Sequence, residues 1–290
     1  MTILDRFVRG RSATARLIYV AGLCSMLLAC GGGGSSSDPP PPPSGSTPPT
    51  SLSCDGYPQT VSGMTQVCRI LQEYAQVTSG VSASTNVGNL TGHGFDILNA
   101  FVVYARIIAG AADQGSATAL AQSVVVNTAN SMISATPDQV DSPQNLQIDF
   151  EIFTATNTNL TLTSGTGNIS VDNYNAILNL TSNTGNASLT TVQGQATVNV
   201  GKGNIDATLS GSGWTGAGMN ATTQLGNITV SRPAAYQAAF TAKSDLGDAS
   251  IDGQQAQAVS GQPPAVVTAG SGAPIMLESK VGDVSVTTAQ

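Results

Sequence analysis

A short phrase recurs six times in the second half of the chain, and it constrains the fold more than any other feature. In each copy, apolar residues alternate with polar ones, a Gly followed by Asn or Asp comes next, and a second alternation follows. A fixed internal period is typical of repeat architectures, in which each unit buries its apolar side against its neighbours. The six steps are Gly167-Asn168, Gly185-Asn186, Gly203-Asn204, Gly226-Asn227, Gly247-Asp248 and Gly282-Asp283, and Gly88-Asn89 looks like an earlier copy.

Each half of the phrase is typical of a strand with one buried face, since its apolar residues recur with a period of two. Gly accepts positive φ, and Asn and Asp tolerate the left-handed region, so we interpret each pair as a structural turn. If the turns stack, successive Asn residues lie about 4.8 Å apart, and their amides can form a ladder of side-chain hydrogen bonds. We therefore predict a mostly β fold, a single-stranded β-helix-like solenoid with its repeats over residues 159–290.

The spacing of the steps predicts where the repeats are interrupted. Successive Gly residues are 18, 18, 23, 21 and 35 positions apart. The two equal steps indicate rungs of constant circumference, whereas the longer steps must contain loops. We expect these loops at residues 211–216 and 253–274. Trp214, the only Trp, either caps the edge of a rung or is an exposed contact residue.

The part between residues 54 and 158 is less regular and is expected to be β structure with one or two short helices. Residues 101–108 are rich in β-branched residues and favour a strand, and apolar residues alternate again over 146–153. Residues 116–122 are rich in Ala and free of Gly and Pro, so they predict a short helix. Residues 65–75 carry an apolar stripe that fits a second helix, although a strand fits them too.

The N-terminus has the features of an export signal. Four Arg residues precede an apolar stretch over residues 17–29, which is too short to span a bilayer as a mature helix, and Leu-Leu-Ala-Cys ends it at Cys30. This pattern resembles a bacterial lipobox, in which Cys30 carries the lipid; an ordinary secretory signal with a chance Cys is the alternative. Gly31, rather than Asp, follows Cys30, which favours the outer membrane. We predict a signal peptide over 1–29 and a lipid-anchored outer-membrane protein.

A spacer and a disulfide are expected next. Residues 30–53 are rich in Gly, Ser and Pro and predict a tether that lifts the folded part off the membrane. Cys54 and Cys68 form an even pair in an oxidising compartment, so we predict a disulfide. It closes a loop of about 15 residues, which the chain-entropy treatment values at roughly 3 kcal/mol. With one His and no other thiol, a metal site is not expected.

The charge balance excludes one class of partner. The whole chain carries a net charge of −7. Without residues 1–29 it loses four basic residues and one acidic residue, so that 6 basic and 16 acidic residues remain and the net charge is −10. This excess of acid opposes nucleic acid and offers no polybasic patch to a membrane surface.

The order of elements resembles the bacterial adhesin-like β-strand-repeat proteins, a domain of unknown function related to the head domains of autotransporter adhesins. The matching parts are the strand that ends at residues 104–106, the Ala-containing helix after it, the strand over 148–152, residues 159–162 and the Gly-Asn/Asp rungs, together covering about 78–290. The resemblance implies a right-handed β-helix-like fold and no catalytic residues. The chain departs from the family in using Thr, Asn, Ser and Gln where the family often has charged residues on outward strand positions.

Few residues offer catalytic chemistry. His93, the only His, lies in Thr-Gly-His-Gly and is expected in a surface loop. Acidic residues recur along the repeats close to Lys residues, which predicts a stripe of exposed charge pairs, each worth little; a saccharide or Ca²⁺ groove is the sharper alternative. The carboxylates are Asp206, Asp248, Asp252 and Asp283, and the pairs are Lys202 with Asp206, Lys243 with Asp248 and Lys280 with Asp283.

We favour a lipid-anchored, non-enzymatic cell-envelope protein that presents a polar solenoid surface for binding, as an adhesin does. Its partner would be an envelope polysaccharide, another envelope protein or a second copy, with membrane contact through the lipid and no cofactor. The alternatives are a polysaccharide-active β-helix enzyme, which needs clustered carboxylates, and a purely structural envelope scaffold. The fold by itself does not choose among them.

Overall fold

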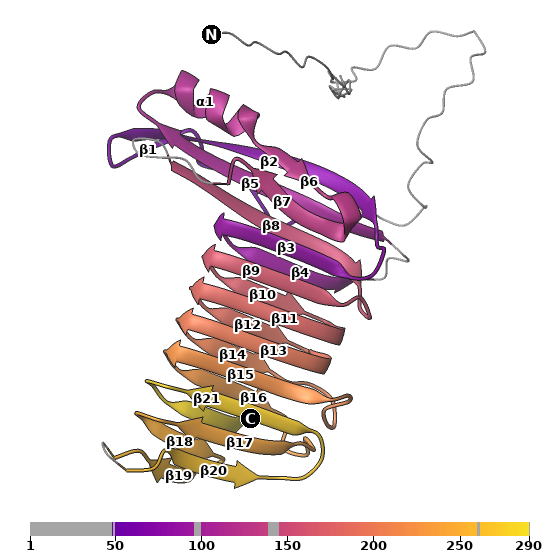
Figure 1. The fold of residues 1–290 in the computed structure, drawn as a ribbon, viewed down its shortest axis with the longest axis vertical. Coiled ribbons are helices and arrows are strands. Elements are labelled where there is room, and N and C mark those ends of the chain that lie inside the picture. The colour runs from indigo at the N-terminus through magenta and orange to yellow at the C-terminus, as the bar shows by residue number, and fades with distance from the viewer. Residues whose placement is uncertain (1–47, 49, 96–99, 139–144, 260–261, 290) are drawn as a thin grey trace, which may run out of the picture. The chain divides into compact units, whose positions relative to one another are not determined.

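The computed structural model describes residue 48 and residues 50–95, 100–138, 145–259 and 262–289. The chain divides into two compact units, residues 1–44 and 45–290, and every described residue belongs to the second. Strands of this unit form one sheet of 12 and one of 10, called sheet A and sheet B below, and one α-helix accompanies them (Figure 1). The predicted mostly β, solenoid-like fold is confirmed. None of the described helices is both long and apolar enough to cross a bilayer.

The chain passes alternately through the two sheets. A strand of sheet B leads through a Gly-Asn or Gly-Asp corner into a shorter strand of sheet A, and each such pair of strands is one rung (Figure 1). Equivalent strands of stacked rungs pair in parallel and in register, so Leu160, Leu178 and Ala196 are neighbours. The rungs are β3/β4 (Val81–Val87, Leu90–Phe95), β9/β10 (Leu160–Thr166, Ile169–Asp172), β11/β12 (Asn175–Thr184, Ala187–Thr190), β13/β14 (Gln193–Lys202, Ile205–Thr208), β15/β16 (Gly218–Leu225, Ile228–Arg232), β21/β22 (Pro274–Ser279, Val284–Thr288) and β17/β18 (Ala239–Ser244, Asp248–Ile251).

Aliphatic side chains of modest size fill the space between the sheets. Ile169, Ala187 and Ile205 form one row of sheet A, Leu162 and Leu180 belong to a row of sheet B, and each is at most 1 % exposed. Full burial of a Leu or Ile side chain stabilises a fold by about 1.5–3 kcal/mol. Rows of this kind therefore supply a core without many aromatic residues.

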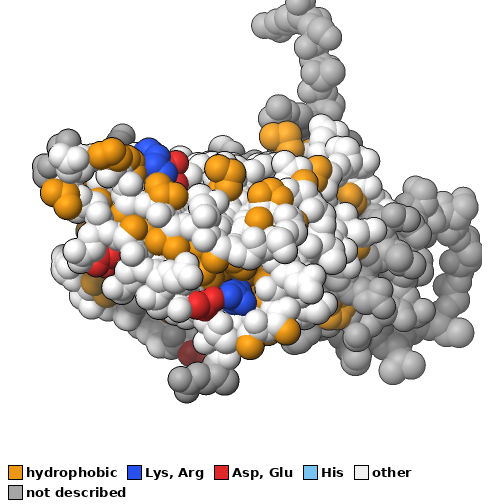
Figure 2. All heavy atoms as spheres, turned by 90° about the horizontal axis from the view of Figure 1, so that it is seen from below, with side chains coloured by type: hydrophobic (Ala, Val, Ile, Leu, Met, Phe, Trp, Pro, Cys, Tyr) orange, Lys and Arg blue, Asp and Glu red, His pale blue; other side chains and the backbone are white. Residues whose placement is uncertain are grey.

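The rungs at the C-terminal end are stacked out of sequence order. β21 lies between β15 and β17, and β22 lies between β16 and β18. Before returning, the chain forms β19 (Gln254–Gln257) and β20 (Ala265–Ala269), which pair antiparallel with β18 and β17 at the end of each sheet. The loop predicted over 253–274 is therefore wrong in part, because residues 254–257 and 265–269 form strands that extend the two sheets. Figure 2 views this end and shows a largely uncharged surface with scattered hydrophobic side chains.

Long antiparallel strands extend sheet A at the other end. β1 (Gln59–Val61), β2 (Met64–Gln76), β5 (Ala100–Ala111) and β8 (Asn145–Ala155) follow one another, and β8 then pairs in parallel with β4. β7 (Met132–Thr136) and β6 (Val125–Asn127) end sheet B, next to a short 3₁₀ turn, Ala129–Ser131. The strands expected at 101–108 and 146–153 are β5 and β8. The helix considered at 65–75 is wrong: β2 alternates Val67 and Leu71 toward the core with Cys68 and Ile70 outward.

The helix predicted at 116–122 is α1 (Gln114–Ser123). Asp113 caps it by accepting a 2.9 Å hydrogen bond from the backbone N–H of Ser116, and Leu120 and Ala121 pack into the main core. Of the two alternatives for Trp214, the structure supports the cap. Its indole is 6 % exposed, and Nε1 donates to the carbonyl of Gly194 at 3.0 Å.

Candidate functional site

The Gly-Asn and Gly-Asp corners form one continuous ladder of hydrogen bonds. In each step, the side-chain oxygen of one corner residue accepts from the backbone N–H of the corner residue in the next rung. The ladder differs from the predicted amide-to-amide contacts, and because it uses only Oδ1 as acceptor, Asp serves as well as Asn. Starting from Asp149, it runs through Asn89, Asn168, Asn186, Asn204, Asn227, Asp283 and Asp248, with all distances 2.7–2.8 Å.

Glycine is required at these corners because the backbones of stacked rungs approach closely. Gly167 has φ of 153°, and a Cβ there would lie 1.9 Å from the carbonyl oxygen of Gly88. A side chain would thus collide with the neighbouring rung. The corner glycines Gly88, Gly167, Gly185, Gly203, Gly226, Gly247 and Gly282 all have φ between 132° and 153°.

A second ladder of hydroxyl groups lies inside the same corners. Three residues before a corner Gly, a buried Ser or Thr donates to the carbonyl oxygen of the neighbouring rung's Gly, as Ser182 does to Gly167 at 3.0 Å. Ser164, Thr223, Ser279 and Ser244 make the equivalent bond. The position in β13 is Val200, so the carbonyl of Gly185 lacks this donor.

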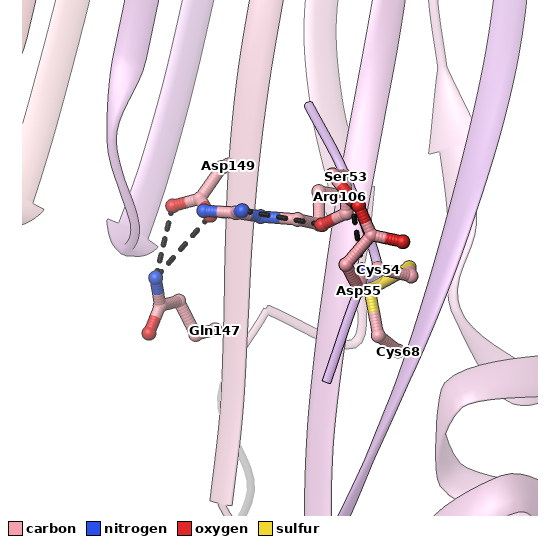
Figure 3. The surroundings of a disulfide bond; sticks show 7 residues. All are labelled: Ser53, Cys54, Asp55, Cys68, Arg106, Gln147 and Asp149. Carbon is pink, nitrogen blue, oxygen red and sulfur yellow. Dashed lines mark hydrogen bonds and ion pairs between the residues drawn. A yellow bond between two sulfur atoms is a disulfide. The ribbon is translucent and has the colours of Figure 1, made fainter. Parts of the chain in front are cut away.

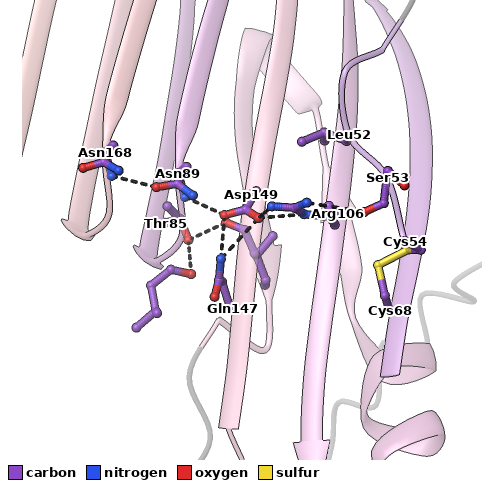
Figure 4. A network of polar contacts seen from close by, with 12 residues as sticks. Leu52, Ser53, Cys54, Cys68, Thr85, Asn89, Arg106, Gln147, Asp149 and Asn168 are labelled. Atoms are coloured by element: carbon purple, nitrogen blue, oxygen red, sulfur yellow. Dashed lines mark hydrogen bonds and ion pairs between the residues drawn. A yellow bond between two sulfur atoms is a disulfide. The ribbon is translucent and has the colours of Figure 1, made fainter. Parts of the chain in front are cut away.

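The corner ladder starts from a buried ion pair at the N-terminal end of sheet A. Asp149, 1 % exposed, receives two hydrogen bonds from the guanidinium of Arg106, at 2.7 and 2.9 Å, and one from Gln147 at 3.0 Å. Figure 4 shows the network running from Asn168 and Asn89 through Asp149 to Arg106. These donors compensate the negative charge of the buried Asp149 carboxylate. The network therefore anchors the start of the corner ladder.

The same arginine binds the segment that leads into the domain. Arg106 donates to the carbonyl of Ser53 at 3.3 Å, next to the disulfide between Cys54 and Cys68 (Figure 3). Leu52 packs on the outer side of sheet A, against a cluster that contains Tyr104. Residues 50–53, which the sequence assigned to the tether, therefore contact the folded domain.

Among the described residues, the outward-facing positions of sheet B carry no charge from β3 to β15, and the exposed Lys202 lies at the corner end of β13. Its side chains form three rows that cross the strands in register. One row is Ser82, Thr161, Asn179, Thr197 and Asn220; the second is Ser84, Thr163, Thr181, Asn199 and Thr222; the third is Asn86, Gly165, Asn183, Gly201 and Gln224. A hollow of about 260 Å³ lies on this face among Thr181, Asn199 and Thr222.

The outer face of sheet A is narrower and carries mostly hydroxyl groups. Two rows cross its short strands, and each contains one acidic residue. The first row is Thr91, Ser170, Ser188, Asp206, Thr229 and Ser285; the second is His93, Asp172, Thr190, Thr208, Ser231 and Thr287. Sheet A thus presents hydroxyls interrupted by charge, whereas sheet B presents an uncharged surface.

His93 is not in the predicted surface loop. It lies on β4, where Nδ1 is 2.7 Å from Asp172 and Nε2 is 3.2 Å from the buried carboxylate of Glu151. Its ring stacks on Phe153 with 4.7 Å between centroids. Burial lowers the pKa of His93, but the two carboxylates outweigh it and hold the pKa above 6.5. The sequence did contain a signal: His93 and Asp172 each stand five residues after a corner Gly, so they are equivalent in stacked rungs.

The predicted charge pairs are replaced by others. Lys243 contacts Glu278 at 2.6 Å and Lys280 contacts Asp245 at 3.1 Å, because the inserted β21 lies beside β17. The salt bridges observed do not include Lys202 with Asp206, Lys243 with Asp248 or Lys280 with Asp283 in the part of the chain that the structure describes.

The four carboxylates singled out in the sequence do not gather in one cluster. Asp206 lies on the outer face of sheet A, Asp248 and Asp283 belong to the corner ladder, and Asp252 pairs with Arg232. Within the described ranges, no three His, Cys, Asp or Glu side chains are grouped so as to hold a metal ion. Cys30 and most of the predicted tether lie outside the described residues.

These features define a class: a two-sided parallel β-solenoid whose faces are built from in-register rows of polar side chains. The chain belongs to the Toastrack DUF4097 family, whose sequence profile matches residues 77–287. The resemblance to an adhesin-like repeat family of unknown function is confirmed.

Several solved structures are similar to this chain, among them three from bacteria. A candidate cell adhesion protein from Clostridium sporogenes is 15% identical with a TM-score of 0.37, over 76% of this chain and 100% of that one. A candidate adhesin from Bacteroides fragilis is 13% identical with a TM-score of 0.39, over 75% and 97% of the chains. Another from Parabacteroides distasonis is 10% identical with a TM-score of 0.29, over 76% and 97%. No curated protein matches the sequence.

Proposed function

We propose that this protein is a lipid-anchored, non-enzymatic component of the bacterial cell envelope that uses the outer face of sheet B to bind an envelope polysaccharide, as an adhesin does. The observation that carries the proposal is the absence of charge over five stacked strands of that face, β3, β9, β11, β13 and β15, within the described residues. The chain has a net charge of −7, so this face is distinct from the rest of the molecule.

The chemistry of the face suits a polymer rich in hydroxyl groups. Ser and Thr hydroxyls and Asn and Gln amides each offer donors and acceptors without charge. Parallel pairing repeats them about every 4.8 Å along the stack. An extended neutral polysaccharide can bond to many such groups in succession, and the hollow beside Asn199 gives one sugar ring a place to sit.

Co-sedimentation of the purified full chain with isolated sacculi and with outer-membrane polysaccharide tests this proposal. Thr181→Lys combined with Asn199→Lys inserts two long charged side chains into the middle of the sheet B face and should weaken binding at least tenfold. Ser188→Lys combined with Thr208→Lys makes the same change on exposed positions of sheet A and serves as the matched control. Equal binding by both variants, or no binding by the parent protein, contradicts the proposal. Retention by envelope proteins alone would assign a protein partner instead.

Attachment through Cys30 has its own test. In cells fed labelled palmitate, the full chain should become labelled and fractionate with the outer membrane, since stable anchoring takes more than one acyl chain. Cys30→Ser should abolish the label and release the protein, whereas Cys24→Ser should leave both unchanged. Unlabelled parent protein would contradict lipid anchoring and leave the binding face to be judged separately.

A further inference from the structure

The chain has a single His, and both nitrogens of its ring face carboxylate oxygens. Nδ1 of His93 lies 2.7 Å from Oδ2 of Asp172 on β10, and Nε2 lies 3.2 Å from Oε1 of Glu151 on β8. The His93 side chain is 25 % exposed, whereas that of Glu151 is only 2 % exposed. The ring is held between the two acids by stacking on Phe153.

This geometry requires a charged imidazole. An ionised carboxylate only accepts hydrogen bonds, and a neutral imidazole has one N–H to donate. Both contacts can therefore be hydrogen bonds only when His93 is protonated. Loss of that proton removes one of the two bonds and leaves the buried Glu151 carboxylate without its cationic partner.

Glu151 also holds the segment that enters the domain. Its oxygens accept from the hydroxyl of Thr50, from the hydroxyl of Ser51 at 2.7 Å and from the backbone N–H of Ser51 at 2.9 Å. The hydroxyl of Tyr104, beside Glu151 on β5, donates to the carbonyl of Pro48 at 2.9 Å. Residues 50 and 51 are thus fixed to sheet A through the same carboxylate that His93 binds, while Leu52 packs on the outer cluster and Arg106 binds the carbonyl of Ser53.

We propose that His93 and Glu151 form a protonation-sensitive clasp, which holds residues 50–53 on sheet A while the imidazole is charged and loosens when it loses its proton. The charged and titratable groups that face the clasp are Asp172 on β10, Tyr104 on β5, and the Arg106–Asp149 ion pair beside it. Arg106 and Asp149 satisfy each other, which leaves His93 as the cation in contact with Glu151.

The pH at which the clasp opens follows from the pKa shifts of His93 and Glu151. The carboxylates of Asp172 and Glu151 raise the pKa of His93 above 6.5 despite its burial, so its contribution is complete below 6.5 and is lost as the pH rises past the raised value. Glu151 is buried, which favours its neutral form, but Thr50, Ser51 and His93 lower its pKa below 4.5, so its contribution is lost only in acid. The clasp is therefore closed in mildly acidic solution and opens as the pH rises through the raised pKa of His93.

Opening of the clasp lengthens the free segment that leads into the domain, but this segment stays joined to β2. The disulfide keeps Cys54 on β2, so only the chain before Cys54 is released. Four residues, 50–53, add at most about 14 Å of reach. Release of Leu52 also uncovers the apolar cluster of Val102, Tyr104 and Phe153 on the outer side of sheet A.

Two measurements on the full chain, carrying a tag without His, test the clasp together. The imidazole Cε1–H signal of the only His gives its pKa by NMR titration, and hydrogen exchange of residues 50–53, corrected for intrinsic rates, reports the closed state. We expect a pKa above 6.5 and a loss of protection that begins near pH 6.5 and is complete once the pH has passed that pKa. The protection of residues 50–53 should fall about tenfold in total for each unit by which the His93 pKa exceeds 6.5. Protection in β11 and β13 should stay unchanged.

Two variants separate the clasp from general loosening. Asp172→Asn removes the partly exposed acid and should lower the pKa of His93 and, with it, the pH at which the loss of protection is complete. His93→Gln should make protection of residues 50–53 low and independent of pH between 6 and 9. A His93 pKa at or below 6.5, protection that does not change with pH, or an upper end of the loss that fails to follow the pKa in Asp172→Asn would overturn the proposal.

Discussion

The side-chain oxygen of Asn168 accepts a 2.8 Å hydrogen bond from the backbone N–H of Asn186, 18 residues further along the chain. The same bond recurs between stacked corners and joins rungs that are separated by 18 to 79 residues. Each corner residue therefore secures the backbone of the next rung, and the regular spacing of the polar faces depends on it.

Asn186→Ala should destabilise the protein by about 1 kcal/mol, because the backbone N–H of Asn204 loses its acceptor. Asn186→Asp keeps the Oδ1 acceptor, as Asp283 does naturally, and should cost less. Urea unfolding followed by far-UV circular dichroism measures both. Equal losses for Ala and Asp would mean that the side-chain oxygen does not secure the corner.

Val200→Thr should be neutral or stabilising by up to about 1 kcal/mol, because its hydroxyl can donate to the carbonyl of Gly185, as Ser182 donates to Gly167. Val198→Thr places the same hydroxyl two residues away, in a row of aliphatic side chains, and should cost about 1–3 kcal/mol. Thermal unfolding of the two variants compares them directly. A loss of stability in Val200→Thr as large as in Val198→Thr would contradict the hydroxyl ladder.

Gly185→Ala should prevent folding or destabilise by several kcal/mol, since a Cβ at this corner would lie 2.1 Å from the carbonyl oxygen of Gly167. Gly211→Ala is the control for backbone conformation alone. It also has positive φ, 82°, but no atom lies within 4 Å of the added Cβ, so it should cost about 1–2 kcal/mol. Soluble yield and the unfolding midpoint report the difference, and similar costs would argue against close stacking of the corners.

Acid should weaken the N-terminal end of the domain through Glu151. Burial alone would raise the pKa of this carboxyl, but its donors hold it below 4.5, so its stabilising contribution is present above 4.5 and is lost as the pH falls through the lowered pKa. Glu151→Gln has no proton to gain, so its urea midpoint should fall less steeply below pH 4.5 than that of the parent chain. Parallel pH profiles would show that Glu151 does not contribute.

The sequence predicted what depends on local chemistry. Gly167 and Asn168 predict a corner by themselves, because the Gly accepts a positive φ and the Asn supplies a hydrogen-bond acceptor. The alternation of apolar and polar residues on either side predicts two half-buried strands. The short helix was predictable for the same reason, since residues 116–122 need no distant partner to favour it.

What the sequence did not predict depends on contacts between distant residues. His93 meets Glu151 and Asp172 only after folding, across 58 and 79 positions. Likewise, Lys243 pairs with Glu278 because β21 enters the stack beside β17, and no local pattern distinguishes a rung in sequence order from an inserted one. The sequence of β2 was ambiguous because its apolar spacing fits both a helix and a strand. Its pairing with β5 makes it a strand.

The order of stacked rungs is the feature on which the continuous faces and the corner ladder depend, and oxidative cross-linking of paired cysteines measures it most directly. Thr222→Cys and Glu278→Cys, neighbours on β15 and β21, should form a disulfide that peptide mass spectrometry detects. Thr222→Cys with Lys243→Cys, which would be neighbours if rungs followed the sequence, should remain unlinked. Cross-linking of the second pair and not the first would contradict the account.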